Sequence, residues 1–137
     1  LSAVAWCDVK TDIQNGLLKF YNDIETGNTD DMKNFLTFET AQKVKSASTT
    51  TVMGNLDAIF GLAQSVKKGE ATIYISGVKF NFLETTPDKV VVRTTFKMAV
   101  DREGKTINND GKHEIVLLKE KDKWFIMNLT DKFSSLK

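Results

Sequence analysis

The stretch "VKKGEATIYIS", residues 66–76, marks the point where the hydrophobic spacing of this chain changes. Before Gly69, apolar residues recur every three or four positions, a spacing typical of amphipathic helices. After Gly69 they alternate with polar residues, as in half-buried strands. Lys67 and Lys68 before the glycine form a common helix ending, because cations favour the negative end of the helix dipole. The sequence therefore predicts helices first and a sheet afterwards.

Three helices are predicted before Gly69. The first presents one apolar face, made of Val9, Ile13, Leu17, Phe20 and Ile24. It should end near Gly27, and a second helix should begin with Thr29 or Asp30 as its N-cap. The third is expected over residues 52–66, whereas residues 38–48 fit either a helical turn or a loop.

Five strands are predicted after Gly69, each rich in β-branched and aromatic residues. They cover residues 71–76, 78–85, 89–100, 112–120 and 123–131. Turns are expected at residues 87–88, 108–111 and 121–122. Because such short connections allow only antiparallel pairing, the strands should form a meander. We therefore predict an α+β domain whose N-terminal helices pack against one face of an antiparallel sheet.

Alternation within residues 89–100 divides that strand into two faces. The face that should be buried carries Val90, Val92, Thr94, Phe96, Met98 and Val100. Arg93 and Lys97 lie on the other face, about 13 Å apart, which is too far for both to hold one small anion on a straight strand. We interpret them as outer-face charges that keep the sheet soluble.

Composition limits the class of protein. The chain has 137 residues, enough for a core of its own, so we assign residues 1–137 to a single domain. It is 41% hydrophobic and 27% charged, which predicts a globular protein. Its net charge of +1 and its interspersed lysines give no reason to expect nucleic-acid binding. Cys7 is the sole cysteine and His113 the sole histidine, so we expect no internal disulfide, metal site or cofactor.

The chain begins with the apolar stretch "LSAVAWC", residues 1–7, which lacks an initiator methionine. We interpret this stretch as a remnant of a signal or membrane anchor, or as an artificial boundary, with Val4 and Trp6 packing on the domain. Seven residues are too few to span a bilayer. Membrane attachment is therefore expected only through a segment preceding Leu1. An exported or cell-envelope location is expected, and a cytoplasmic one stays open.

Two stretches resemble the NTF2-like (cystatin-like) superfamily. The first, "LLKFYNDIETGNTDDMKNFLT" at residues 17–37, is similar to the opening helix, turn and second helix of that superfamily. The second, "EIVLLKEKDKWFIMNL" at residues 114–129, is similar to its closing hairpin. The resemblance implies a curved sheet wrapped around the first helix, leaving a cone-shaped pocket. Isomerases and dehydratases of this kind place Asp, His or Tyr there, whereas other members bind ligands, dimerise or assemble secretion systems.

Four polar residues are candidates for acid–base roles in the cone: Tyr21, Tyr74, His113 and Asp131. Each also has a structural interpretation. Buried tyrosines usually serve as core rings, His113 follows a predicted turn and so should lie at a solvated strand end, and Asp131 lies near the chain end. The residues expected to line a ligand pocket are Tyr21, Phe60, Tyr74, Phe96 and Trp124.

Our first functional hypothesis is a non-enzymatic domain that binds a small apolar ligand or a protein partner. A homodimer through the outer sheet face is also expected, because Val91, Val116 or Leu118 would otherwise be exposed. The alternatives are a small-molecule isomerase or dehydratase using Tyr21, His113 or Asp131, and an extracytoplasmic assembly domain of a secretion or conjugation system. A dry apolar cone would exclude the enzyme, whereas a buried carboxylate or histidine there with a strongly shifted pKa would exclude the binding-only domain.

The last predicted strand leaves one question open. Strict alternation puts Trp124, Ile126 and Asn128 on one face and Phe125 and Leu129 on the other. If the first face points inward, as the resemblance implies, Trp124 lines the cone. If the second does, Trp124 belongs to an outer interface.

Overall fold

The computed structural model describes residues 3–46 and 55–131. Four helices precede four strands, which confirms the α+β class. The elements are α1 (Ala3–Thr26), α2 (Thr29–Asn34), α3 (Phe38–Ser46), α4 (Asn55–Lys67), β1 (Thr72–Thr85), β2 (Lys89–Arg102), β3 (Lys105–Glu120) and β4 (Lys123–Asp131).

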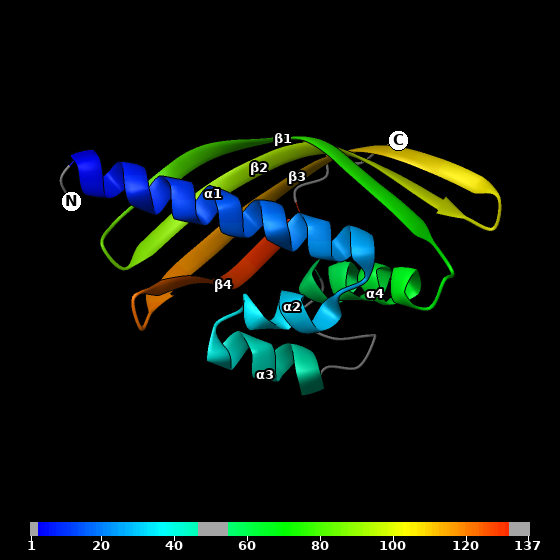
Figure 1. Cartoon of the computed structure of the whole chain (residues 1–137), viewed down its shortest axis with the longest axis horizontal. Coiled ribbons are helices and arrows are strands. Elements are labelled where there is room, and N and C mark those ends of the chain that lie inside the picture. The colour runs from blue at the N-terminus through cyan, green and yellow to red at the C-terminus, as the bar shows by residue number, and fades with distance from the viewer. Residues whose placement is uncertain (1–2, 47–54, 132–137) are drawn as a thin grey trace.

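The strands form one antiparallel sheet in the order β1-β2-β3-β4, the meander that the short turns predicted. The sheet arches over α1 and α4, while α2 and α3 lie beside its β4 edge (Figure 1). It is open, since β1 and β4 are its two edges. Helices thus cover one face of a curved sheet, and the other face is turned outward.

The core lies between α1, α4 and the inner face of the sheet. Its buried apolar residues include Ile13, Leu17, Phe20, Tyr21, Ile24, Leu56, Ile59, Val90, Val92, Phe96, Ile115, Leu117, Trp124, Ile126 and Leu129. The α1 members follow the helical spacing of the sequence, and the β2 members follow its alternation. The predicted faces of the first helix and of residues 89–100 are therefore confirmed.

The prediction of two separate strands at residues 71–76 and 78–85 is wrong, because both belong to β1. Gly77 has a φ of 64°, and the pairing register with β2 shifts between Ser76 and Lys79. A glycine in the left-handed region lets a strand bulge without ending it. Gly77 therefore bends β1 and does not end it.

The predicted turn at residues 108–111 is also wrong, because these residues lie within β3. The chain turns earlier, at Glu103 and Gly104, where φ is 53° and 78°. Gly111 is instead required for packing, since a Cβ at this position would lie 2.1 Å from the Phe96 ring. A glycine imposed by a neighbouring ring looks the same in sequence as one imposed by a turn.

The helices agree with the sequence in part. Gly27 ends α1 with a φ of 74°, as predicted. Helix α1 starts before Val9, at Ala3, and the Trp6 ring packs edge-on against Phe82 at 5.3 Å, which confirms that Trp6 contacts the domain. The ambiguous stretch at residues 38–48 is helical as far as Ser46. The predicted start of the last helix at residues 52–54 lies outside the described residues.

A bulge at Met127 settles which face of β4 is buried. Trp124 and Ile126 are buried, but the register with β3 then shifts, so Leu129 is buried and Asn128 is exposed. Trp124 therefore points inward, as the resemblance implied. Strict alternation along the whole strand is wrong.

Both edges of the sheet are partly covered. At β4, the Ile126 N–H donates to Phe35 O at 2.8 Å, and the Thr37 N–H donates to Ile126 O at 2.9 Å. These bonds form a short parallel bridge that holds the bulged part of the strand. At β1, the Ile75 N–H donates to Glu25 Oε2 at 2.8 Å.

Candidate functional site

Four of the residues proposed from the sequence, Tyr21, Phe96, His113 and Asp131, meet at one cavity of about 50 Å³ between α1, α4 and the sheet. The residues that line it are Tyr21, Ile24, Ala58, Ile59, Leu62, Ile75, Phe96, Met98, His113 and Asp131. Its wall is mostly apolar, with Tyr21, His113 and Asp131 as the titratable side chains. We call these three residues together with Thr94 the cone cluster.

Strand pairing explains why the cone cluster forms. Thr94 of β2 pairs with His113 of β3, and His113 pairs with Asp131 of β4, so the three residues form one row across the sheet. Tyr21 faces this row from α1, one helical turn after Leu17 on the buried face. The Asp131 N–H also donates to Asn55 Oδ1 at 2.6 Å, which ties this end of β4 to the start of α4.

The Tyr21 hydroxyl is the centre of the cone cluster. Its Oη lies 2.5 Å from Thr94 Oγ1 and 2.8 Å from His113 Nδ1. The Tyr21 and His113 rings stack with centroids 5.7 Å apart, and Phe96 packs against both. Because these polar atoms are buried, each hydrogen bond also avoids the cost of an unpaired group.

Burial keeps both ionisable rings uncharged near neutral pH. It raises the pKa of Tyr21 well above its usual range, and the nearby Asp131 carboxylate adds to that rise. Burial lowers the pKa of His113 from 6.5 to about 4. Tyr21, Thr94 and His113 therefore offer neutral donors and acceptors, which suit a neutral polar group better than an ion.

Several expectations about individual residues are wrong. We expected His113 to lie at a solvated strand end, but it is 4% exposed. The reason is that residues 108–111 continue strand β3 and do not form a turn before it. Tyr74 is 57% exposed and lies on the outer face, since its neighbours Ile73 and Ile75 occupy the inner one. Of the expected pocket residues, Tyr21 and Phe96 line the cavity, while Phe60 is buried in the core.

Trp124 is likewise buried in the core, at 8% exposure, and is not among the cavity-lining residues. Thr94 is the cluster member that the sequence analysis missed. A threonine on the buried face of a Val-rich strand was the available signal. Its partners depend on strand register, which a single sequence does not provide.

Residues 3–46 and 55–131 contain no group of three or more His, Cys, Asp or Glu side chains that could hold a metal ion. Among the same residues, no helix is both long and apolar enough to cross a membrane.

Comparisons with known proteins identify relatives by structure alone. No protein-family model matches the sequence, and no curated protein matches it either. Similar solved structures do exist, and their sequence identities are low enough that they inform the fold only.

One similar structure is Bdellovibrio bacteriovorus Bd1075, with a TM-score of 0.64 and 13% identity over 100% of this chain. This chain spans only 45% of that protein. A Streptomyces avermitilis candidate dehydratase of the NTF2-like family has a TM-score of 0.59 and 14% identity, covering 88% of this chain and 93% of its own. The association domain of CaMKII from C. elegans has a TM-score of 0.62 and 12% identity, with coverages of 90% and 95%.

These similarities extend over most of the chain, and the arrangement of helices under a curved, unclosed sheet agrees with them. The sequence resemblance concerned the first two helices and the closing hairpin, which are α1, α2 and the β3–β4 pair of the structure. The chain therefore has an NTF2-like fold.

Proposed function

We propose that this domain binds a small, largely apolar molecule that carries one hydrogen-bonding group. The observation that supports this proposal is the hydrogen bond of 2.8 Å between Tyr21 Oη and His113 Nδ1 at the wall of an otherwise mainly apolar cavity. Ligand sites commonly combine an apolar lining with a few polar groups that fix orientation. The Tyr21–His113 pair would supply that polar contact.

Cavity size limits the ligand. About 50 Å³ is far below the usual 300–1,000 Å³ of drug-sized pockets and holds only a water molecule or two. Leu62, Ile75 and Met98 in its wall are only half-buried, so they lie on the side that faces solvent. A ligand would enter by displacing them, and methionine adapts readily to such changes.

Protonation favours binding over catalysis. At pH 7, His113 with a pKa of about 4 is a weak base, and Tyr21 with a raised pKa is a weak acid. Proton transfer is most efficient when the pKa of the catalytic group lies near the working pH. The cone cluster is better suited to hold a hydrogen bond than to move a proton.

Phenol and toluene test this proposal, because they differ mainly in the hydroxyl group. Binding can be followed through the NMR signals of His113, the only histidine of the chain. We expect phenol to bind more tightly than toluene, and Tyr21→Phe to reduce phenol binding by about tenfold while leaving toluene binding nearly unchanged.

Tyr74→Phe is the matched control, because Tyr74 is exposed on the outer face and should not affect either probe. The binding proposal fails if neither probe shifts the His113 signals. It also fails if Tyr74→Phe weakens the binding of phenol as much as Tyr21→Phe does.

A second candidate is an isomerase or dehydratase. It is favoured by the buried His113 with its strongly lowered pKa, the feature that we expected to exclude a binding-only domain, and by its contact with Tyr21. That expectation left out the direction of the shift, which here moves the pKa away from neutral pH. The S. avermitilis protein of similar fold supports it as well. A bound substrate that lets water in would raise the pKa of His113 toward its usual range, so that His113 could accept a proton while Tyr21 donates to a developing oxyanion.

Loss of water from 4-hydroxy-2-butanone, followed by NMR, tests the enzyme candidate. An active enzyme should produce the unsaturated ketone, and His113→Gln should slow this by at least about 100-fold. A rate equal to that of buffer, or a rate unchanged in His113→Gln, would argue against a dehydratase of β-hydroxy ketones.

A protein partner, an exported location and a role in a secretion or conjugation assembly remain predictions. The C. elegans CaMKII domain supports association through this fold, and a homodimer would use the outer sheet face. Sedimentation at rising protein concentration tests the homodimer, and Val116→Lys should then favour the monomer. A chain that stays monomeric throughout would contradict it. The sequence preceding Leu1 tests the location.

A further inference from the structure

A row of three side chains crosses the outer face of the sheet: Lys79 of β1, Thr95 of β2 and Lys112 of β3. Lys79 pairs with Thr95, and Thr95 pairs with Lys112. Because neighbouring strands lie about 4.8 Å apart, the two lysine Cα atoms are roughly 10 Å apart with the threonine between them. The long, flexible lysine side chains can therefore reach one group placed above Thr95.

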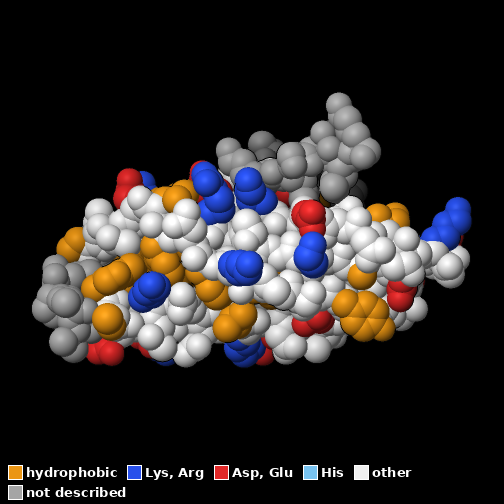
Figure 2. Space-filling model, turned by 90° about the horizontal axis from the view of Figure 1, so that it is seen from above, with side chains coloured by type: hydrophobic (Ala, Val, Ile, Leu, Met, Phe, Trp, Pro, Cys, Tyr) orange, Lys and Arg blue, Asp and Glu red, His pale blue; other side chains and the backbone are white. Residues whose placement is uncertain are grey.

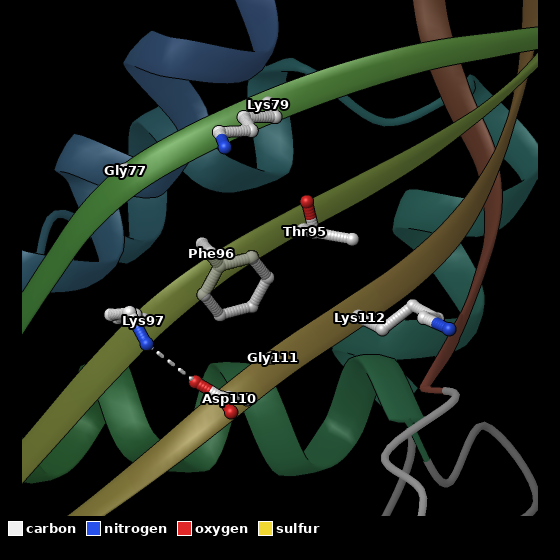
Figure 3. Close-up of a pocket in the computed structure, with 8 residues that line it drawn as sticks. All are labelled: Gly77, Lys79, Thr95, Phe96, Lys97, Asp110, Gly111 and Lys112. Carbon is white, nitrogen blue, oxygen red and sulfur yellow. Dashed lines mark hydrogen bonds and ion pairs between the residues drawn. The ribbon is translucent and has the colours of Figure 1, made fainter.

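The row lies in an open groove of about 440 Å³ (Figure 3). The groove is lined by Gly77, Lys79, Thr95, Phe96, Lys97, Asp110, Gly111 and Lys112. Gly77 lacks a side chain and leaves space beside the row, whereas the place of a Cβ on Gly111 is taken by the Phe96 ring on the inner side of the sheet. Figure 2 shows this outer surface of the molecule, where lysine and arginine side chains gather over the middle.

Charge in the groove is not balanced. Lys97 forms an ion pair with Asp110 at 3.1 Å, and on the same face Arg93 pairs with Glu114 at 3.2 Å. Within residues 3–46 and 55–131, Lys79 and Lys112 have no acidic partner, and the Thr95 hydroxyl has no hydrogen bond. Two ammonium groups and one hydroxyl thus remain available along the row. In Figure 3 the Lys112 side chain points away from Thr95, so it would have to turn toward an anion placed there.

We propose that this row, the Lys79–Thr95–Lys112 site, binds an oxyanion of a small molecule, either a carboxylate or a phosphate group. Ammonium groups bind such anions through charge-assisted hydrogen bonds, which are stronger than neutral ones. The Thr95 hydroxyl adds a donor between them. The site lies on the opposite face of the sheet from the cone cluster, so it does not depend on the function proposed for the cone.

Inorganic phosphate and acetate, added at constant ionic strength, are the probes. We expect one of them to give saturable shifts of the Gly77, Thr95 and Gly111 backbone amide signals in NMR. Saturation by phosphate alone identifies a phosphate site, and saturation by acetate alone a carboxylate site. Thr95→Val, which removes only the hydroxyl, should weaken binding about threefold.

The double variant Lys79→Met and Lys112→Met should weaken binding by at least about tenfold, because both ammonium groups are lost. Its matched control is Lys105→Met and Lys123→Met, which makes the same change in net charge at two exposed strand positions outside the groove. The control should keep nearly the full affinity. Asp110→Asn should act in the opposite direction and tighten binding about threefold, since it removes the one negative charge of the groove and releases Lys97.

Three results would overturn the proposal. The amide shifts could rise linearly with both probes, which would show no site. The control pair could weaken binding as much as the site pair, which would show a general charge effect. Sedimentation could show a dimer whose interface covers the row, with no shift from either probe.

Discussion

The rings of Tyr21 and His113 stack within 8° of parallel, while the tyrosine Oη lies 2.8 Å from the histidine Nδ1. This one contact joins α1 to β3 across 92 residues of sequence. The two residues of this contact are buried in the core of the domain and also line the proposed ligand site. The stability of the fold and the chemistry of the cone should therefore respond to the same substitutions.

Replacing Tyr21 with phenylalanine should destabilise the protein by about 1–3 kcal/mol, because Thr94 and His113 would each lose a buried hydrogen-bond partner. Urea unfolding measures this difference. Tyr74→Phe is the comparison, and it should change the free energy of unfolding by less than about 0.5 kcal/mol, since Tyr74 is on the surface. Equal effects of the two substitutions would contradict the burial of the Tyr21 hydroxyl.

Acid should weaken the fold through His113. Its pKa is lowered from 6.5 to about 4 in the folded protein, so the unfolded chain takes up the proton at a higher pH. The contribution of the neutral imidazole to the free energy of unfolding is fully present above about pH 6.5, and it is lost as the pH falls toward 4. It amounts to about 3 kcal/mol at most.

The difference in unfolding free energy between wild type and His113→Gln, followed from pH 7 to pH 4, isolates this effect from the carboxylates. NMR titration of the single imidazole gives the pKa directly. A folded-state value near 6.5 would show that His113 is not desolvated.

The Gly111 position should not tolerate a side chain. Gly111→Ala would place a methyl group 2.1 Å from the Phe96 ring, and displacing that ring should cost about 1–3 kcal/mol. Gly61→Ala is the matched control, because nothing lies within 4 Å of its added Cβ in helix α4. That substitution should stabilise the protein by about 0.5–1 kcal/mol. The unfolding temperature should therefore fall below that of the wild type in Gly111→Ala and rise above it in Gly61→Ala.

Removing the Trp124 ring should cost about 3–5 kcal/mol, as expected for a large side chain in a packed core. Phe38→Ala serves for comparison, because Phe38 is 75% exposed and its loss should have little effect on unfolding. A loss below about 1 kcal/mol for Trp124→Ala would place the indole outside the core.

Sequence periodicity was sufficient for the apolar face of α1, the order of helices before strands and the buried face of β2. It failed at Gly77, Gly111 and Met127 for related reasons. The two glycines resemble turn signals, although one allows a bulge and the other makes room for the Phe96 ring. The bulge at Met127 is held by hydrogen bonds from residues 35–40, which are distant in sequence.

The candidate sites depended even more on pairing register. Tyr21, His113 and Asp131 could each be named from residue type and position. The sequence could not show that they share one cavity, because this requires Thr94, His113 and Asp131 to align across three strands. Register also determines the outer face. The sequence drew attention to Arg93 and Lys97, which lie on one strand, whereas Lys79, Thr95 and Lys112 come together only because three strands align.

The covered edges of the sheet have a consequence for polymerisation. Fibrils grow when an edge strand of one molecule hydrogen-bonds to that of the next, so that each added copy offers a new edge. Here Glu25 accepts a hydrogen bond from the β1 edge, and Phe35 and Thr37 occupy part of the β4 edge. Edge-to-edge addition of a second copy should therefore be hindered at these points of β1 and β4.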